Sequence, residues 1–456
     1  MPPSAAQRPI VSTSSTAPVA AVSATASAAG GPRRLLVRLR GGIRRPSAIG
    51  VVLSATVLFL VVFGLLMVLS ASAVESYTDG LGFFARFGSQ GAYAAVGVVV
   101  MLAVSRLPRL WTRRAAMAVL LVSCLLQLLA LTTPLGVQIG DNTNWVRIGP
   151  LTGQPSEGIK LGLVVWLGFA LGRDQDELKN WRTLARRILP VAAPSLLLVM
   201  AGGDLGTTVV MAVFTIGAAF FAGVRMKHLG AVMGVGAFAA ILIALSSATR
   251  RGRLSAFFGG TSAVNPDVNW QLDNAHYALA SGSVWGVGLG NSHAKWSWLP
   301  SADTDFIFAV IGEELGLIGA CVVLLLFVLL AVLLLRIVRT APDATARVTT
   351  ATVLVWLIFQ AFVNVGVVLG LLPTLGVPLP FISAGGTALI SSLTAIGVVL
   401  SFVQADSAPA PAASAPAEGN PPKPGRRARR RTSVSASPVR QRDVRIRRTA
   451  GVGGDG

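Results

Sequence analysis

Cysteine and histidine are scarce in this sequence, and their scarcity excludes several kinds of site. The chain has 2 Cys and 3 His in 456 residues. Cys124 and Cys321 each lie inside an apolar block, so neither a disulfide framework nor a Cys-based metal site can form. The sequence also lacks a phosphate-binding P-loop, and it lacks an internal repeat of fixed period that would indicate a duplicated transporter half.

Apolar residues, by contrast, are abundant and come in long blocks. The mean hydropathy is +0.67 and 53% of the residues are hydrophobic, which is more than a soluble core needs. We therefore predict an all-α polytopic membrane protein with about ten transmembrane helices. The predicted spans cover residues 48–70, 89–105, 115–133, 157–172, 188–201, 205–223, 229–246, 305–335, 348–371 and 385–403.

Basic residues indicate which loops face the cytoplasm. The loops after the second, fourth, sixth and eighth predicted spans carry Arg and Lys, whereas the intervening loops are nearly free of them. We expect the basic loops to be cytoplasmic and, because the number of spans is even, both termini as well. Seven predicted spans then precede a large loop, about 247–304, which is expected to be extracytoplasmic. The exceptions to the charge pattern lie in this loop, at Arg250, Arg251, Arg253 and Lys295.

The formal net charge of +20 is concentrated in the two ends of the chain and in short loops. Topology explains these basic residues better than nucleic-acid binding does, so no nucleic-acid partner is expected. We predict disordered basic cytoplasmic tails at 1–46 and 405–456, which flank a transmembrane domain at 47–404. The C-terminal tail is expected either to contact anionic lipid or an acidic partner, or to be a solvated segment without specific function.

Asp305 stands where the large loop meets the eighth predicted span. A carboxylate at such an interface is partly desolvated, which raises its pKa towards the range useful for a general base. The alternative is a helix N-cap, because Thr304 and Asp305 precede an apolar run. Nearby, Lys295 would either meet an anionic substrate group or extend to the lipid headgroups. The side of the membrane expected for this loop excludes reactions that use ATP or nucleotide sugars, which are cytoplasmic.

Further charged residues interrupt the predicted spans. Glu313 and Glu314 lie inside the eighth span, where acids are costly and are either functional or paired with a buried cation. Glu157 and Lys160 are three residues apart, so on a helix they share a face and can pair. Lys160 and Arg147 are also candidates to attract a pyrophosphate.

Prolines and glycines interrupt the apolar stretch 364–387. A re-entrant or cavity-lining backbone requires such interruptions. A simple turn between two spans, the alternative, needs fewer of them.

Five motifs, in this chain order, resemble those of the SEDS family (shape, elongation, division and sporulation), and within it the FtsW-like cell-division branch. The resemblance covers roughly residues 48–403. The motifs are LLMVLSAS at 65–72, QPSEGIK at 154–160, DLGTT at 204–208, GVGLGNSHAKWSWLPSADTDFIFAVIGEELG at 286–316 and GLLPTLGVPLPFISAGGT at 370–387.

The resemblance implies a peptidoglycan glycosyltransferase at the outer face of the cytoplasmic membrane, at the division septum. Its substrate would be lipid II, the undecaprenyl-pyrophosphate-linked disaccharide pentapeptide. Its partners would be a class B penicillin-binding transpeptidase and other divisome proteins. Two other functions are kept as alternatives, a lipid II flippase and a noncatalytic division scaffold.

The resemblance also implies that Asp305, in the TDFIF motif, is the residue required for catalysis, and we expect it to be the general base. With no tight metal site in the sequence, any Mg²⁺ or Mn²⁺ ion would be bound largely through substrate phosphates and Asp305. The candidate substrate-binding residues are Lys295, Lys160, Glu157, Arg147, Ser383, Gly385 and Gly386.

The sequence departs from the usual family pattern at four positions near these motifs. Asp303 stands where a histidine is common, Asn144 where arginine is usual, Gly203 in place of a proline, and Ala384 in place of a tyrosine. The change at Asn144 weakens the assignment of an anion site around Arg147. Asp303, like Glu313 and Glu314, is a candidate modulator of the site, because a second acid would raise the pKa of Asp305 or help to bind a cation.

Overall fold

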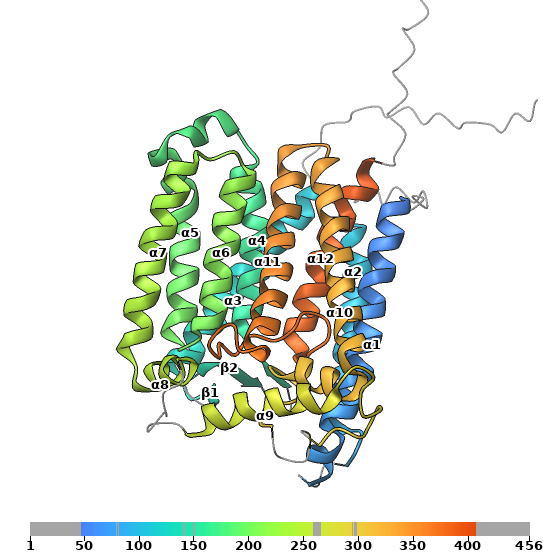
Figure 1. The fold of residues 1–456 in the computed structure, drawn as a ribbon. Helices are drawn as coiled ribbons and strands as arrows, with labels where there is room; N and C mark the ends of the chain where they lie inside the picture. Colours follow the sequence, from blue (N-terminus) through green and yellow to red (C-terminus); the bar gives the residue numbers. More distant parts are fainter. Residues whose placement is uncertain are drawn as a thin grey trace, which may run out of the picture. The chain divides into compact units, whose positions relative to one another are not determined.

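The computed structural model describes residues 47–406, apart from 79, 81, 140–141, 149–150, 259–265, 294 and 296–298. The predicted tail 1–46, and all of the predicted tail 405–456 except its first two residues, lie outside this described part. Figure 1 shows the helices and a small sheet. The elements are α1 (Ala48–Thr78), α2 (Ala85–Ser105), α3 (Arg109–Thr132), β1 (Gly136–Ile139), β2 (Asn142–Ile148), β3 (Leu151–Gly153), α4 (Pro155–Leu171), the 3-10 helix η1 (Gln175–Lys179), α5 (Trp181–Ala201), α6 (Leu205–Phe221), α7 (Met226–Ser246), α8 (Ala248–Phe257), α9 (Pro266–Gly282), α10 (Ile307–Arg339), α11 (Ala344–Val368) and α12 (Gly386–Asp406).

Each predicted span corresponds to one long helix, α1 to α7 and α10 to α12. In the described part of the chain, 8 helices are long and apolar enough to cross a membrane. The helices α4 and α6 fall short of that length, since each has 17 residues. The helical membrane fold is therefore confirmed, whereas the count of ten spans stays a prediction.

A three-stranded antiparallel sheet, not predicted from the sequence, connects α3 to α4. Its strands follow in the order β1-β2-β3, with Gly136 opposite Val146 and Val146 opposite Gly153. Val137, Trp145 and Val146 are β-branched or aromatic, so this segment favours extended backbone. The sheet lies at the same end of the helices as α8 and α9 (Figure 1).

The helix α10 is broken near its start, whereas a single continuous span was predicted. Gly316 has φ 67° and ψ −168°, which separates a short first segment from the long remainder. A Cβ at Gly316 would lie 2.4 Å from the backbone nitrogen of Gly286, so only glycine fits this crossing. Glu313 and Glu314 are thus in a short segment that ends at the break, not inside a continuous span.

The glycine-rich loop after α9 supplies the hydrogen bonds that the break removes. The amides of Val287 and Gly288 donate to the carbonyls of Glu313 and Glu314, each at 3.0 Å. On the other side of the break, the amide of Leu317 donates to the carbonyl of Ser283 at 3.0 Å. Broken helices are tolerated within membranes where other protein groups satisfy the freed backbone, and this loop does so.

The segment 369–385, between α11 and α12, is irregular, and its stretch 379–383 is buried. A Cβ on Gly64 would lie 2.6 Å from the carbonyl oxygen of Phe381, so this segment touches α1 directly. Gly64 lies well inside the candidate span Ala48–Ala73. Non-helical backbone therefore reaches the middle of a span, which confirms the prediction of a re-entrant segment over that of a simple turn.

The connections of the helices separate into two ends. The 3-10 helix η1 and the basic loops that join α2 to α3, α6 to α7 and α10 to α11 lie at one end (Figure 1). The sheet, α8, α9 and the loop between α1 and α2 lie at the other. This arrangement agrees with the alternation of basic and non-basic loops, and it places residue 305 at the end away from the basic loops.

The contact at Gly64 gives a test of the re-entrant segment. Alanine normally favours a helix over glycine, but Gly64→Ala would push the backbone of Phe381 and Ile382 away. We expect a loss of about 1–3 kcal/mol, seen as a lower thermal unfolding midpoint in detergent. Gly91→Ala in α2 is the control, because its Cβ would meet nothing within 4 Å. Equal midpoints for the two variants would contradict the close contact.

Candidate active site

Asp305 lies in a tight turn just before α10, which begins at Ile307. The position before the helix is taken by Phe306, and no side chain caps the helix there. The amides of Thr304 and Phe306 both donate to the carbonyl of Ser301, at 3.1 and 3.2 Å. The N-cap alternative for Asp305 is therefore wrong, and its carboxylate is available for another role.

The backbone of this turn is fixed by the re-entrant segment and by α11. The side-chain amide of Asn364 donates both to the carbonyl of Asp305, at 2.8 Å, and to the carbonyl of Val377, at 2.9 Å. The hydroxyl of Ser383 donates to the carbonyl of Thr304 at 2.5 Å and accepts from the amide of Leu379 at 2.8 Å. Ser383, a predicted substrate contact, thus acts here as a brace of the turn.

The carboxylate of Asp305 is half-buried and faces Gly376. A Cβ at Gly376 would lie 3.7 Å from Oδ2 of Asp305, which is an ordinary contact distance, so the re-entrant segment borders the carboxylate here. Burial raises the pKa of Asp305 to about 6, the nearby negative charges of Asp204 and Asp303 add to this, and the charge of Arg253 opposes it. Among the described residues, no hydrogen bond to the carboxylate of Asp305 is seen. A carboxylate in this state suits proton abstraction near neutral pH.

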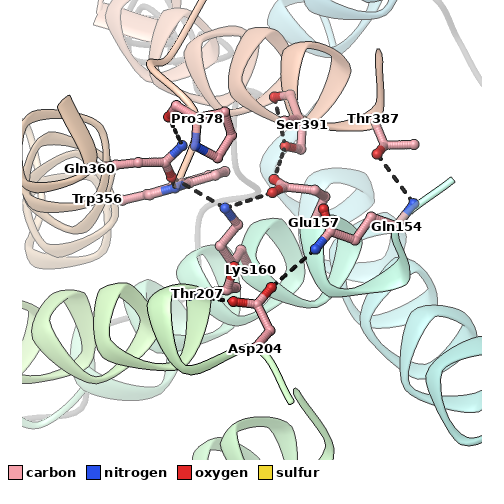
Figure 2. A network of polar contacts seen from close by, with 11 residues as sticks. Gln154, Glu157, Lys160, Asp204, Thr207, Trp356, Gln360, Pro378, Thr387 and Ser391 are labelled. Atoms are coloured by element: carbon pink, nitrogen blue, oxygen red, sulfur yellow. Dashed lines mark hydrogen bonds and ion pairs between the residues drawn. The ribbon is translucent and has the colours of Figure 1, made fainter. Parts of the chain in front are cut away.

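The predicted pair Glu157 and Lys160 forms on α4, in the interior of the protein (Figure 2). Nζ of Lys160 lies 2.8 Å from Oε1 of Glu157, and the two side chains are 1% and 3% exposed. Lys160 also donates to the side chain of Gln360 at 3.2 Å and lies 5.3 Å from the ring centre of Trp356. Glu157 accepts from the hydroxyl of Ser391 at 2.9 Å. The pair joins α4 to α11 and α12.

Asp204, which caps α6, lies next to this pair. Its Oδ1 accepts from the amide of Thr207 at 2.8 Å, and its Oδ2 accepts from Nε2 of Gln154 at 3.1 Å (Figure 2). The charge of Asp204 acts on both Lys160 and Asp305. Asp204 therefore links the interior pair electrostatically to the candidate base.

The acids on the first segment of α10 are both satisfied by the glycine-rich loop and α1. Oε1 of Glu314 lies 3.6 Å from Nζ of Lys295, and the hydroxyl of Ser70 donates to both carboxylate oxygens at 2.6 and 2.8 Å. Glu313 accepts from the amide of His293 at 2.8 Å and from the hydroxyl of Ser292. Pairing with a buried cation is thus confirmed for Glu314.

Lys295 is buried in this pair and does not extend to the lipid headgroups, as one alternative held. Its ammonium group also donates to the carbonyl of Gly290. A direct contact of Lys295 with substrate stays a prediction.

The remaining predicted site residues are Arg147, Gly385, Gly386 and Asp303. Arg147 is exposed on β2, and no contact of its side chain with Asp305 or the α4 pair is seen in the described part of the chain. Gly385 and Gly386 are at the start of α12, where the amide of Gly385 donates to Oε1 of Gln90 at 3.2 Å. Asp303 forms an ion pair with Arg86 of α2, with Nη1 and Oδ2 separated by 3.0 Å. Its position makes Asp303 part of the support of the turn.

Three residues near Asp305 were not predicted as site residues. In the sequence Asp204 is part of the DLGTT motif, and an acid between two apolar blocks is itself a signal. Arg253 is an exception to the pattern of basic loops, and that exception is a signal for it. Arg86 had no signal in the sequence, because its contact depends on the packing of α2.

No group of three or more His, Cys, Asp or Glu side chains that could hold a metal ion is found in the described residues. A divalent cation bound through substrate phosphates and Asp305 stays a prediction, and no step of the chemistry below depends on it.

The helices that carry these residues match a known family. Residues 51–407 match the FtsW/RodA/SpoVE family model, described as a cell cycle protein. The chain belongs to this family. The resemblance drawn from the five motifs is thereby confirmed, and the matched residues include every residue of the candidate site described above.

Two relatives of this family member illustrate the similarity. The probable peptidoglycan glycosyltransferase FtsW of Mycobacterium tuberculosis is 33% identical over 369 residues, which are 81% of this chain and 70% of the relative. Stage V sporulation protein E of Bacillus subtilis is 34% identical over 351 residues, which are 75% of this chain and 93% of the relative.

Two solved structures have a similar fold. The rod shape determining protein RodA of Thermus thermophilus has a TM-score of 0.57 at 26% identity, and covers 78% of this chain and 96% of its own. A chain from a peptidoglycan synthase complex, whose structure concerns the coordination of polymerization and crosslinking, has a TM-score of 0.62 at 25% identity. It covers 78% of this chain and 97% of its own.

The interior pair of α4 gives a test that does not need an activity. Lys160→Met leaves the carboxylate of Glu157 buried without its cation, which is expected to cost about 3–5 kcal/mol of stability. Thermal unfolding in detergent would show this as a lower midpoint.

The double variant Glu157→Gln, Lys160→Met is the matched control, because it removes both charges. Its midpoint is expected to recover most of the loss. A double variant as unstable as Lys160→Met would show that the ion pair is not the source of the stability.

Proposed function

We propose that this protein is a peptidoglycan glycosyltransferase that polymerises lipid II. The observation that carries the proposal is Asp305, whose carboxylate is half-buried, has a pKa raised to about 6 and is held on a braced turn. The relatives named as peptidoglycan glycosyltransferases support the reaction class. The lipid-linked substrate fits an active site at one end of a set of membrane helices.

In the reaction, Asp305 accepts the proton of a sugar hydroxyl as its oxygen attacks the anomeric carbon of a second lipid-linked sugar. A new C–O bond forms while the bond from that carbon to the pyrophosphate breaks, and the leaving pyrophosphate takes the electron pair. One carboxylate on the attacking side suffices for such a direct, inverting displacement. The proton on Asp305 then passes to water.

The leaving pyrophosphate requires positive charge near the reacting atoms. Lys160 and Lys295 are each paired with a buried glutamate, so their charges are partly compensated. Arg253 on α8 is the cation that acts on Asp305. We propose that Arg253 contributes to the pyrophosphate site, in place of the exposed Arg147.

The two ends of the helices suit an orientation with the basic loops in the cytoplasm and Asp305 outside. Both predicted termini would then be cytoplasmic. The apolar side chains of α7, such as Val235 at 71% and Phe238 at 64% exposure, are suited to contact with lipid tails. The undecaprenyl chains would lie along such surfaces.

A class B penicillin-binding transpeptidase is the partner that fits best. A structure of a similar chain comes from a peptidoglycan synthase complex, in which polymerization and crosslinking are coordinated. The FtsW and SpoVE relatives favour a role in division or sporulation, and hence the septum and the other divisome proteins as partners.

Polymer formation tests the function directly. Purified protein, with a class B transpeptidase partner and labelled lipid II in detergent, is expected to make glycan strands. Asp305→Asn keeps the shape of the side chain but cannot accept the proton, so the rate should fall by about 10²-fold or more. A gel of the labelled products measures both.

Each alternative function gives a different result. Movement of lipid II across sealed vesicles without polymer would replace the proposal by a flippase. No activity of either kind in the presence of the partner would favour a scaffold. Polymer made equally fast by Asp305→Asn would exclude this residue as the base.

The pH dependence of polymerisation tests the environment of Asp305. Only the deprotonated carboxylate accepts a proton, so the rate should fall as the pH decreases through about 6 rather than near the ordinary value of 3.8. Arg253 lowers the pKa of Asp305, so Arg253→Ala should move this decline to higher pH and also slow the reaction at its optimum.

Arg251→Ala is the matched control on the same helix. Arg251 is exposed and its guanidinium donates to the carbonyl of Leu245 at 3.1 Å. Its pH profile should match the wild type. A profile of Arg253→Ala that also matches the wild type would remove Arg253 from the site.

A further inference from the structure

One face of α2 holds the two segments that form the candidate active site. Arg86, Gln90 and Tyr93 are four and three residues apart, so they follow one side of the helix. Each contacts a different part of the site, although α2 itself contributes no residue to the chemistry proposed above.

Arg86 contacts the turn that carries Asp305. Its Nη1 lies 3.0 Å from Oδ2 of Asp303, whose side chain is 6% exposed. The carbonyl of Asp303 accepts from the amide of Ala384 at 2.8 Å. Asp303 lies two residues before Asp305. Its side chain is therefore bound by α2, and its backbone is bound by the re-entrant segment.

Gln90 contacts the re-entrant segment one helical turn further along α2. Its Nε2 donates to the carbonyl of Ser383 at 3.2 Å, and its Oε1 accepts from the amide of Gly385 at 3.2 Å. Gln90 is 5% exposed, so these bonds lie in the interior. Ser383 in turn donates to the carbonyl of Thr304, so two hydrogen bonds lead from Gln90 to the residue before Asp305.

Tyr93 closes this face at the start of α12. A Cβ on Gly386 would lie 2.4 Å from the ring of Tyr93, and the tyrosine hydroxyl donates to the carbonyl of Thr152 at 3.4 Å. The face of α2 thus touches the turn, the re-entrant segment and the sheet in succession.

We propose that Arg86 and Gln90 are positioning residues for Asp305, and that the ion pair of Arg86 with Asp303 fixes the turn from which Asp305 meets the substrate. This inference rests on the proposed glycosyltransferase function. The physical reason is the burial of Asp303, because a buried carboxylate that loses its cation moves towards water and takes its backbone with it. Asp305 is two residues away, and a shift of about 1 Å at a reacting group can cost about 10²-fold in rate.

The ion pair with Arg86 explains how Asp303, a second acid, can lie so close to Asp305. Asp303 adds negative charge beside the base, and Arg86 compensates that charge while holding the turn. An ion pair with only a structural role would change stability, whereas a positioning role predicts a loss in kcat at nearly constant KM.

The test measures kcat and KM for polymerisation of lipid II by the full chain with its partner. Arg86→Gln and Asp303→Asn are expected to lower kcat by about tenfold or more and to change KM by less than about twofold. The charge-swapped double variant, Arg86→Asp with Asp303→Arg, is expected to regain most of the lost kcat. Arg86→Lys, which keeps the charge, is expected to lie between wild type and Arg86→Gln.

Arg109→Gln is the matched control, because Arg109 forms an ion pair with Asp343 between α3 and α11, at the end of the helices away from Asp305. Its kcat should equal that of the wild type. Thermal unfolding of every variant identifies those that fail to fold. If Arg86→Gln does not fold, Arg86→Lys and Gln90→Ala replace it as tests of the positioning role. Both are expected to lower kcat.

The outcomes separate this proposal from the proposed function. Single variants with wild-type kcat, or a charge swap no faster than the single variants, would overturn the positioning role while leaving the glycosyltransferase intact. An inactive wild type, tested beside Asp305→Asn, would overturn the function itself.

Discussion

Backbone groups inside a membrane protein need hydrogen-bond partners within the protein, and the site depends on how this chain supplies them. Two stretches of irregular backbone support the site, the break in α10 at Gly316 and the segment 369–385, and the second of these contacts the turn that carries Asp305. The glycine-rich loop after α9 satisfies the first, and side chains such as Asn364 and Ser383 satisfy backbone groups of the second. Irregular backbone with these partners can place a polar side chain where a continuous helix would present only its apolar surface.

The acids around the site differ in what compensates them. Asp204 accepts hydrogen bonds from Gln154 and Thr207, and Asp303 is paired with Arg86. Asp305 receives no such bond from the described residues, and burial raises its pKa to about 6. Nearby negative charge on Asp204 and Asp303 adds to the effect of burial on Asp305. Burial raises the pKa of Asp204 as well. What distinguishes Asp305 is that the described residues leave its carboxylate without hydrogen bonds, whereas Asp204 is engaged by Thr207 and Gln154.

The buried ion pair on α4 has a separate role. Glu157 and Lys160 compensate one another and reach α11 and α12 through Gln360 and Ser391. A buried ion pair of this kind is weak evidence for stability, because the attraction between the two charges is largely offset by the free energy of removing both from water. Its position beside Asp204 connects it to the reacting carboxylate by charge rather than by contact.

The sequence by itself determined the features that depend on local pattern. The apolar blocks predicted the long helices, the spacing of Glu157 and Lys160 predicted their pair, and the motif around Asp305 predicted the candidate base. Tertiary structure decided the rest. The break at Gly316 appears only when the loop after α9 packs against it, and Arg86 meets Asp303 across 217 residues of sequence. Periodicity and spacing determine which residues share one face of a helix. Contacts between distant segments depend on how the helices pack, which no local pattern encodes.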